Sequence, residues 1–196
     1  MSNSANAIPE ATLFPGWLPA GEADALLADL LVQVPWEVHR IRMFGRWVDS
    51  PRLSCWIGDP GTGYVYSGAR FEPQPWPPAL QALRERIDAA AGVAMNSVLA
   101  NLYRDGRDAM GWHSDDEPEL GPRPVIASLS LGGTRRFVFK HRRDAARKFE
   151  LPLEHGSLLL MQGDTQAGWK HALPRTARPV PARVNLTFRR ILPRVL

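Results

Sequence analysis

The chain has 196 residues, of which 44% are hydrophobic and 22% are charged, a balance typical of one folded domain and not of a disordered or fibrous protein. Its formal net charge is +4, and only three of its 24 basic residues are lysines, a bias that a GC-rich genome also produces. No apolar run is long enough for a membrane span, and no secretory signal is expected. The single cysteine, Cys55, excludes an internal disulfide, so we expect a reducing cytosol.

The first half of the chain alternates between helical and strand-like segments. Residues 1–19 hold three prolines and little periodicity, so we expect an extended lead. Apolar residues at helical spacing predict one helix over residues 21–34 and a second over residues 78–91, where a proline occupies the first turn. Between them, residues 35–77 carry many aromatic residues among glycines and prolines, a pattern typical of short strands joined by turns.

After residue 91 the pattern becomes that of strands. Four short segments between turn-forming residues are predicted to be strands, namely 125–131, 136–140, 157–161 and 183–189. The basic stretch 140–148 is predicted to form a hairpin loop. Many short strands behind a helical front end predict an α+β, mainly β fold, an antiparallel sandwich or jelly roll with an N-terminal extension.

His113-Ser-Asp115 is a candidate pair of metal ligands. On an extended segment, residues two apart point to the same side, so this imidazole and carboxylate can bind one ion together. Two histidines and one carboxylate leave three positions of an octahedral ion open, which is the arrangement of non-haem Fe(II) oxygenases. A bare pair of this kind is more often a polar turn. The third ligand must come from elsewhere, and the candidates are His39, His141, His155 and His171, of which the last is favoured because an arginine-containing strand follows it.

A second element is the segment Arg183–Arg189. Strand alternation sends Arg183, Asn185, Thr187 and Arg189 to one face and apolar residues to the other. The two arginines lie about 20 Å apart along such a strand, yet their long side chains can converge on one small dianion. The alternative is an edge strand whose polar face meets solvent.

Taken together, these elements resemble the AlkB family of nucleic-acid dealkylases over residues 44–192. The resemblance is strongest to the branch represented by AlkB homologue two, which repairs duplex DNA. The matching stretches are Asn101–Gly106, His113–Glu117, Ile126–Ser128, Phe137–Phe139, Leu153–Leu158, Trp169–His171 and Arg183–Arg189.

The resemblance implies an oxygenase that uses Fe(II), 2-oxoglutarate and O2 on a double-stranded β-helix (jelly roll). In that arrangement His113, Asp115 and His171 hold the iron. Residues 96–196 form the jelly-roll core, and residues 1–95 form an extension whose helices and hairpins make a nucleotide-recognition lid, all in one compact unit. The implied reaction hydroxylates an N-alkyl carbon of a damaged base and releases formaldehyde.

For the cosubstrate, the resemblance implies that Arg183 pairs with the distal carboxylate of 2-oxoglutarate and that Arg189 acts near its metal-bound end. Asn101 and Tyr103 match residues that hydrogen-bond the same molecule, and Asn185 lies in the same pocket. A charge-assisted bidentate pair is a strong way to orient a carboxylate.

For the substrate, the base must leave the helix to reach the metal, and a wedge must fill the gap. The resemblance implies that Phe44, in a hairpin over residues 42–47, is this wedge. For other aromatic residues the composition alone favours core packing, namely Trp36, Trp47, Trp76 and Trp112.

Further substrate contacts follow from the same resemblance. Trp56 and Tyr66 match positions that line the base pocket, and Glu117 matches a residue that reads the base edge. Arg142 and Arg143, in the basic stretch, are candidates for phosphate contacts. That stretch is shorter than in the related branch, which leaves the preference for duplex DNA open.

Three functions stay open at this point. The first is repair of N-alkylated bases such as 1-methyladenine and 3-methylcytosine in single- or double-stranded DNA. The second is the same chemistry on RNA, free nucleotides or a protein side chain. The third is a metal-free module that reads damaged DNA, which the intact triad and both arginines argue against. We expect a monomer with no membrane partner, in the cytosol and nucleoid of a bacterium.

Overall fold

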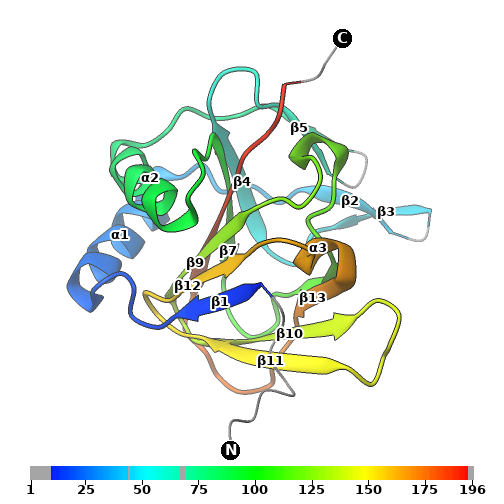
Figure 1. The fold of residues 1–196 in the computed structure, drawn as a ribbon. Helices are drawn as coiled ribbons and strands as arrows, with labels where there is room; N and C mark the ends of the chain where they lie inside the picture. The colour runs from blue at the N-terminus through cyan, green and yellow to red at the C-terminus, as the bar shows by residue number, and fades with distance from the viewer. Residues whose placement is uncertain (1–9, 44, 67–68, 194–196) are drawn as a thin grey trace, which may run out of the picture.

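Two antiparallel sheets form the body of the computed structural model, which describes residues 10–43, 45–66 and 69–193 (Figure 1). The larger sheet has the strand order β1-β12-β9-β14-β7-β4, and the smaller has the order β11-β10-β13-β8. The strands of the larger sheet are β1 (Ala11–Phe14), β4 (Leu53–Gly58), β7 (Ser97–Tyr103), β9 (Ile126–Gly132), β12 (Leu158–Met161) and β14 (Arg183–Arg189). Those of the smaller sheet are β8 (Met110–His113), β10 (Arg135–His141), β11 (Lys148–Leu153) and β13 (Trp169–Leu173).

Two small hairpins and two short helical segments complete the fold. The hairpins pair β2 (Arg40–Met43) with β3 (Arg46–Asp49) and β5 (Tyr64–Tyr66) with β6 (Ala69–Phe71). The helical segments are the 3-10 turn η1 (Pro118–Leu120) and α3 (Thr165–Gly168). In the described ranges, no helix is both long and apolar enough to cross a bilayer.

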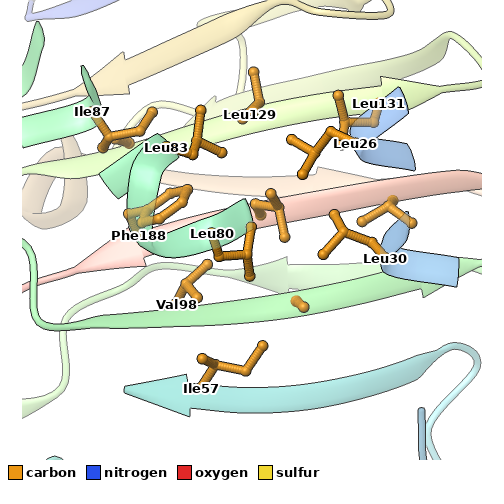
Figure 2. Close-up of a cluster of buried hydrophobic side chains, with 14 of the residues drawn as sticks. Leu26, Leu30, Ile57, Leu80, Leu83, Ile87, Val98, Leu129, Leu131 and Phe188 are labelled. Carbon is orange, nitrogen blue, oxygen red and sulfur yellow. The ribbon is translucent and has the colours of Figure 1, made fainter. Parts of the chain in front are cut away.

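Helices α1 (Ala20–Gln33) and α2 (Pro78–Ala91) cover one face of the larger sheet, and the smaller sheet lies toward its other face (Figure 1). Proline at the start of α2 suits a first helical turn, and Gly92 ends the helix in the left-handed region with φ of 69°. The apolar stripes of both helices pack on the sheet, as Figure 2 shows for Leu26 near Leu131 and Leu83 near Leu129.

A second core cluster lies between the two sheets. It joins side chains of the larger sheet, such as Leu99 and Leu159, to those of the smaller sheet, such as Phe139 and Leu173. The molecule is therefore layered as helices, larger sheet and smaller sheet, and its functional polar residues must lie within or at the rim of the second cluster.

The sequence predicted most of these elements. The two helices and the strand at Arg183–Arg189 lie where the periodicity placed them, the jelly-roll architecture is confirmed, and residues 140–148 join β10 to β11 as a hairpin. Residues 11–14 of the predicted extended lead are extended, and they pair with β12 as an edge strand, which was not predicted. Four residues are too few for a strand pattern to stand out among prolines.

The expected division at residue 95 is not a boundary between separate bodies. Strands β1 and β4 come from the N-terminal half, yet they hydrogen-bond to β12 and β7 in the larger sheet. Both halves therefore build the same sheet, in keeping with one compact unit. The lid role of the N-terminal half stays a prediction.

Strand β14 is central, which overturns the edge-strand alternative. It pairs with β7 on one side and β9 on the other, and all seven of its residues are buried. Its apolar face, with Val184, Leu186 and Phe188, meets the helices, so its polar face is turned toward the smaller sheet. Polar side chains buried at the centre of a sheet need partners.

We predict that Phe188→Ala lowers the free energy of unfolding by about 3–5 kcal/mol, because the ring is fully buried and its loss leaves a cavity. The control Val32→Ala removes a side chain that is 85% exposed and should change stability by less than about 0.5 kcal/mol. Urea denaturation followed by circular dichroism measures both. Equal effects of the two substitutions would contradict the packing described.

Candidate metal and cosubstrate site

Three side chains meet between the sheets in the arrangement of a metal site. His113 ends β8, Asp115 follows two residues later, and His171 lies on the neighbouring strand β13, directly opposite His113. One potential ligand atom from each residue lies within 4.8 Å of the others. The structure therefore selects His171 from the four candidate histidines as the one that joins the His113–Asp115 pair.

The ring of His113 is prepared for coordination. Its Nδ1 lies 2.8 Å from the carbonyl oxygen of Gly111, so Nδ1 carries the proton and donates it, and Nε2 keeps its lone pair. Burial, followed by the nearby charge of His171, lowers the pKa of His113 to about 3, while Asp115 acts in the opposite direction. The imidazole is therefore neutral at pH 7, as a ligand must be.

Asp115 is held on several sides. Nη2 of Arg189 donates to its Oδ1 at 2.5 Å, and its backbone N–H donates to Oε1 of Gln166 at 2.9 Å. Burial acts to raise the pKa of Asp115, but the charge of Arg189 and then the contacts with His171 overcome it and hold the pKa well below its usual range. Its Oδ2 lies 3.5 Å from Nε2 of His171, so this oxygen faces the two histidines and is placed for a shared ion.

The predicted cosubstrate residues line the same cavity as the three metal ligands. All five, Asn101, Tyr103, Arg183, Asn185 and Arg189, border it together with His113, Asp115 and His171. Arg189 lies at the metal end, bonded to Asp115, whereas Arg183 lies six residues away at the other end of β14. A small molecule that spans the cavity would touch the metal at one end and Arg183 at the other.

Arg183 is a buried cation without a carboxylate partner. Its side chain is 1% exposed, and its Nη2 donates to the Ser130 hydroxyl at 2.9 Å. Its Nε and Nη1 have no hydrogen-bond partner in the described parts of the chain. The guanidinium also lies over the ring of Tyr103, at 5.2 Å from the centroid.

Burial lowers the pKa of Arg183 to about 10, with a further lowering by Arg135, but the group stays charged at pH 7. A buried charge of this kind is costly unless an anion pairs with it. Two free N–H donors on a planar guanidinium fit one carboxylate in the bidentate manner. The site therefore fits a dicarboxylic oxo-acid such as 2-oxoglutarate, and the two histidines with one carboxylate fit Fe(II).

The amide side chains of the cavity are fixed by residues that sequence reasoning did not single out. Nε of Arg52, itself buried, donates to Oδ1 of Asn101 at 2.8 Å, so the amide NH2 group of Asn101 is the end left to donate. Nδ2 of Asn185 donates to the Ser128 hydroxyl at 2.8 Å. The alternation of serine with apolar residues over 126–131 was the available sign of an inward polar face; nothing in the sequence marked Arg52.

The structure does not bring the substrate residues inferred from the resemblance together in one site. Phe44 lies outside the described residues, and for Tyr66 the structure describes only the backbone, in β5. Trp56 is 2% exposed, and its indole N–H donates to the carbonyl oxygen of Thr62 at 2.9 Å. It is a core residue here, and stacking on a base would require its exposure. Glu117 is half-buried and precedes η1, two residues after Asp115.

The two arginines of the basic stretch lie in the β10–β11 hairpin. Nη2 of Arg142 donates to Oδ2 of Asp116, next to the ligand Asp115, which ties this hairpin to the metal end of the cavity. Arg143 is exposed, and only its backbone N–H is bonded, to Nδ1 of His141 at 3.3 Å. Their phosphate contacts stay predictions.

Two of the four tryptophans expected in the core are exposed instead. Trp47, in β3, is 49% exposed, and Trp112, in β8, is 43% exposed. Trp36 and Trp76 pack against the first core cluster as expected. Composition could not separate these cases, because a large apolar ring in a short strand suits a core and an exposed hairpin or edge equally well.

The fold and the geometry of the site define a class of protein. The family model described as the 2OG-Fe(II) oxygenase superfamily matches residues 10–189, and the chain belongs to that superfamily. It is an Fe(II)- and 2-oxoglutarate-dependent dioxygenase, and Fe(II), 2-oxoglutarate and O2 are its cofactor and cosubstrates.

Within the superfamily the chain is a member of the AlkB family. It is 40% identical over 202 residues to human alpha-ketoglutarate-dependent dioxygenase alkB homolog 3, and the alignment covers 98% of this chain and 70% of that protein. It is also 40% identical over 181 residues to human DNA oxidative demethylase ALKBH2, and the alignment covers 87% of this chain and 69% of that protein. The two identities are equal, so they do not favour the branch of homologue two.

Solved structures show the same fold at lower identity. The structure of OsALKBH1 superposes with a TM-score of 0.64 at 20% identity and covers 94% of this chain and 99% of that chain. A Pseudomonas putida prolyl-4-hydroxylase gives a TM-score of 0.59 at 18% identity and covers 92% of each chain. These likenesses establish the fold and carry no statement about the substrate.

We predict that Arg183→Gln weakens binding of 2-oxoglutarate at least about 30-fold, because removing one partner of a buried charge pair costs about 2 kcal/mol or more. Titration calorimetry with Mn(II)-loaded protein measures it. The control Arg178→Gln removes an exposed arginine five residues earlier and should leave the affinity unchanged. An affinity of Arg183→Gln within about threefold of the wild type would contradict the assigned role.

Proposed function

We propose that this protein removes N-linked alkyl groups from damaged bases in nucleic acid, with 1-methyladenine and 3-methylcytosine in DNA as its substrates. The observation that carries this proposal is the joint placement of the His113–Asp115–His171 triad and the unpaired Arg183 at opposite ends of one cavity. The 40% identity to a protein named DNA oxidative demethylase supports the choice of substrate.

Each residue of the site then has a part in the reaction. Iron bound by the triad supplies the oxidising power that O2 and 2-oxoglutarate generate. Arg183 binds the distal carboxylate, and Asn101 and Tyr103 line the path between the carboxylate and the metal. Arg189 holds Asp115 by its Oδ1, so that Oδ2 stays turned toward the metal position. The hydroxylated N-alkyl carbon then collapses to formaldehyde and leaves the unmodified base.

The cavity walls favour an oxidation that excludes water. Phe137, which lines the cavity, lies 5.2 Å from His171 between ring centroids, and the buried ring of Phe139 lies 5.8 Å from the same histidine. Apolar rings around a metal ligand restrict solvent and keep the electrostatic interactions of the site strong. The base enters from the side of His113, the more exposed of the two histidines.

The β2–β3 hairpin is the proposed reader of the duplex. Trp47 and Val48 on β3 are 49% and 38% exposed, so the hairpin offers apolar side chains for contact with a partner. Gly45 in the turn has φ of 79°, a conformation that favours glycine. With Phe44 beside this glycine in the sequence, the hairpin is suited to insert an apolar wedge between base pairs. Tyr66 and Glu117 would then contact the flipped base.

We further propose that the protein acts as a monomer in the bacterial cytosol, at the nucleoid. The single buried cysteine, Cys55, suits a reducing compartment, and the net charge of +4 suits a nucleic-acid ligand. RNA is the second candidate substrate, because the same oxidation at the metal would remove an N-alkyl group from a base of RNA.

We expect purified protein with Fe(II) and 2-oxoglutarate to release equal amounts of succinate and formaldehyde from an oligonucleotide that carries 1-methyladenine. Fluorimetric detection of formaldehyde and mass spectrometry of the base measure the reaction. Asp115→Ala removes a metal ligand and should abolish it. Succinate without formaldehyde would keep the oxygenase chemistry and exclude this substrate, whereas no turnover by protein with bound iron would exclude both.

We expect Phe44→Ala to reduce activity on duplex substrate at least tenfold more than activity on single strands, because only a duplex needs a wedge to fill the gap. Comparing kcat/KM on matched single-stranded and duplex oligonucleotides measures the difference. Val48→Ala, on the same hairpin, is the control for a general loss of apolar contact. Equal losses on both substrates would contradict the wedge.

A further inference from the structure

The three lysines of the chain lie side by side on one face of the smaller sheet. Lys140 on β10 is directly opposite Lys148 on β11 and directly opposite Lys170 on β13. Residues in direct register share a face of the sheet, with Cα atoms about 5 Å apart. In a chain with 24 basic residues, the only lysines thus form one row across three strands.

This row lies on the outer face of the sheet, behind the metal site. The neighbouring register row consists of Phe149, Phe139, His171 and His113. Phe139 and His171 are buried in it, so that row faces the larger sheet and the cavity. Because side chains alternate along a strand, the lysines one residue away point outward. The lysine row is therefore a surface feature distinct from the cavity.

An exposed tryptophan adjoins the row. Trp112 on β8, the edge strand of the smaller sheet, is 43% exposed. Nζ of Lys140 lies over its ring at 4.5 Å from the centroid. The outer face thus combines three ammonium groups with one accessible indole.

The positive charge of the row is not neutralised by the protein. Among the described residues, no ion pair involves Lys140, Lys148 or Lys170. Glu150 carries the one carboxylate on these three strands, and it is paired with Arg136 at 3.1 Å. Like charges directly opposite one another on a sheet destabilise it. A row of three without a counter-ion is explained if an external anion binds there.

We propose that this outer face, formed by Lys140, Lys148, Lys170 and Trp112, binds a single strand of nucleic acid outside the catalytic cavity. The lysines contact successive phosphates, and Trp112 stacks on an unpaired base. The proposal rests on the proposed function in taking nucleic acid as the ligand, but it adds a second contact surface that holds nucleotides flanking the one in the cavity.

The chemistry of the face favours a single strand over a duplex or a protein partner. A basic groove with an interleaved aromatic side chain is the usual arrangement for single-stranded nucleic acid, because every base has a face that can stack. A duplex hides its bases, and Trp112 would have no stacking partner. Lysine, a point charge on a flexible stem, suits phosphates in any sequence, whereas arginine suits a fixed bidentate contact.

The position of the row suits a strand that continues from the cavity. Trp112 precedes His113 in the sequence, and Lys170 precedes His171, so both outer residues lie one step from a metal ligand. Trp112 also lies on an edge strand, around which a bound strand can pass from the cavity to the outer face. The β10–β11 hairpin projects from the same sheet, and its exposed Arg143 extends the positive charge (Figure 1).

The test measures binding of an unmodified, fluorescein-labelled single-stranded DNA of roughly 15 nucleotides by anisotropy, at a series of salt concentrations and without iron. The triple substitution Lys140→Gln, Lys148→Gln and Lys170→Gln should weaken binding about tenfold or more at 50 mM salt. It should also reduce the slope of log Kd against log salt by about 2, because each phosphate contact on a single strand contributes ~0.7. Trp112→Ala should weaken binding about fivefold or more.

The matched control is Arg86→Gln, Arg107→Gln and Arg123→Gln, which removes the same charge from exposed arginines that already pair with Glu22, Asp105 and Glu10. It should leave the slope within about 0.5 of the wild type. Mn(II) binding by every variant verifies that the fold and the triad are intact.

The proposal is overturned if wild-type protein does not bind the oligonucleotide at 50 mM salt, or if the triple lysine variant and the control have equal slopes. Because the assay uses unmodified DNA and no turnover, the inference stands if the slope changes as expected while formaldehyde release fails. If dealkylation is observed and the two slopes are equal, the lysine-row proposal fails and the proposed function stands.

Discussion

The arrangement of the molecule depends on a charge that the protein buries without neutralising. Arg183 begins the central strand of the larger sheet, with its guanidinium 1% exposed and two of its nitrogens lacking partners within the described chain. A folded protein tolerates such a group only when something compensates for its cost. We expect a bound dianion to supply this compensation, so that cosubstrate binding stabilises the fold.

The two sheets contribute different residues to the site. Strand β14 of the larger sheet presents Arg183, Asn185 and Arg189 along one face, while the smaller sheet supplies both histidines. Asp115 connects the residues of the two sheets, because it lies beside His171 of the smaller sheet and accepts a hydrogen bond from Arg189 of the larger sheet. The metal position and Arg183 thereby lie toward the two ends of one strand, with Asn185 between Arg183 and Arg189.

Much of this could be predicted from sequence, because the informative patterns are local. Period-2 alternation predicted the polar face of Arg183–Arg189, and helical spacing predicted both helices with their bounds nearly as observed. Spacing made His113 and Asp115 a candidate pair, and the arginine strand with the family resemblance gave the pair its weight. His171 was favoured among four histidines because an arginine-containing strand follows it, and the register of β13 against β8 places it opposite His113.

The remaining features depend on contacts that are distant in sequence. Arg52 is separated by 49 positions from Asn101, whose amide it orients, and no local pattern marks such a pair. Trp56 and Trp112 both lie on edge strands, yet Trp56 is 2% exposed and Trp112 is 43% exposed. Trp56 packs in the second core cluster between the sheets, whereas Trp112 lies on the outer face of the smaller sheet. The lysine row likewise exists only in the cross-strand register.

The most direct test of the account is a crystal structure of the protein with Mn(II) and 2-oxoglutarate. We expect Mn(II) on His113, Asp115 and His171, with the distal carboxylate accepting hydrogen bonds from Nε and Nη1 of Arg183. A cosubstrate that binds the metal but leaves Arg183 unpaired, or a metal bound away from the triad, would contradict it.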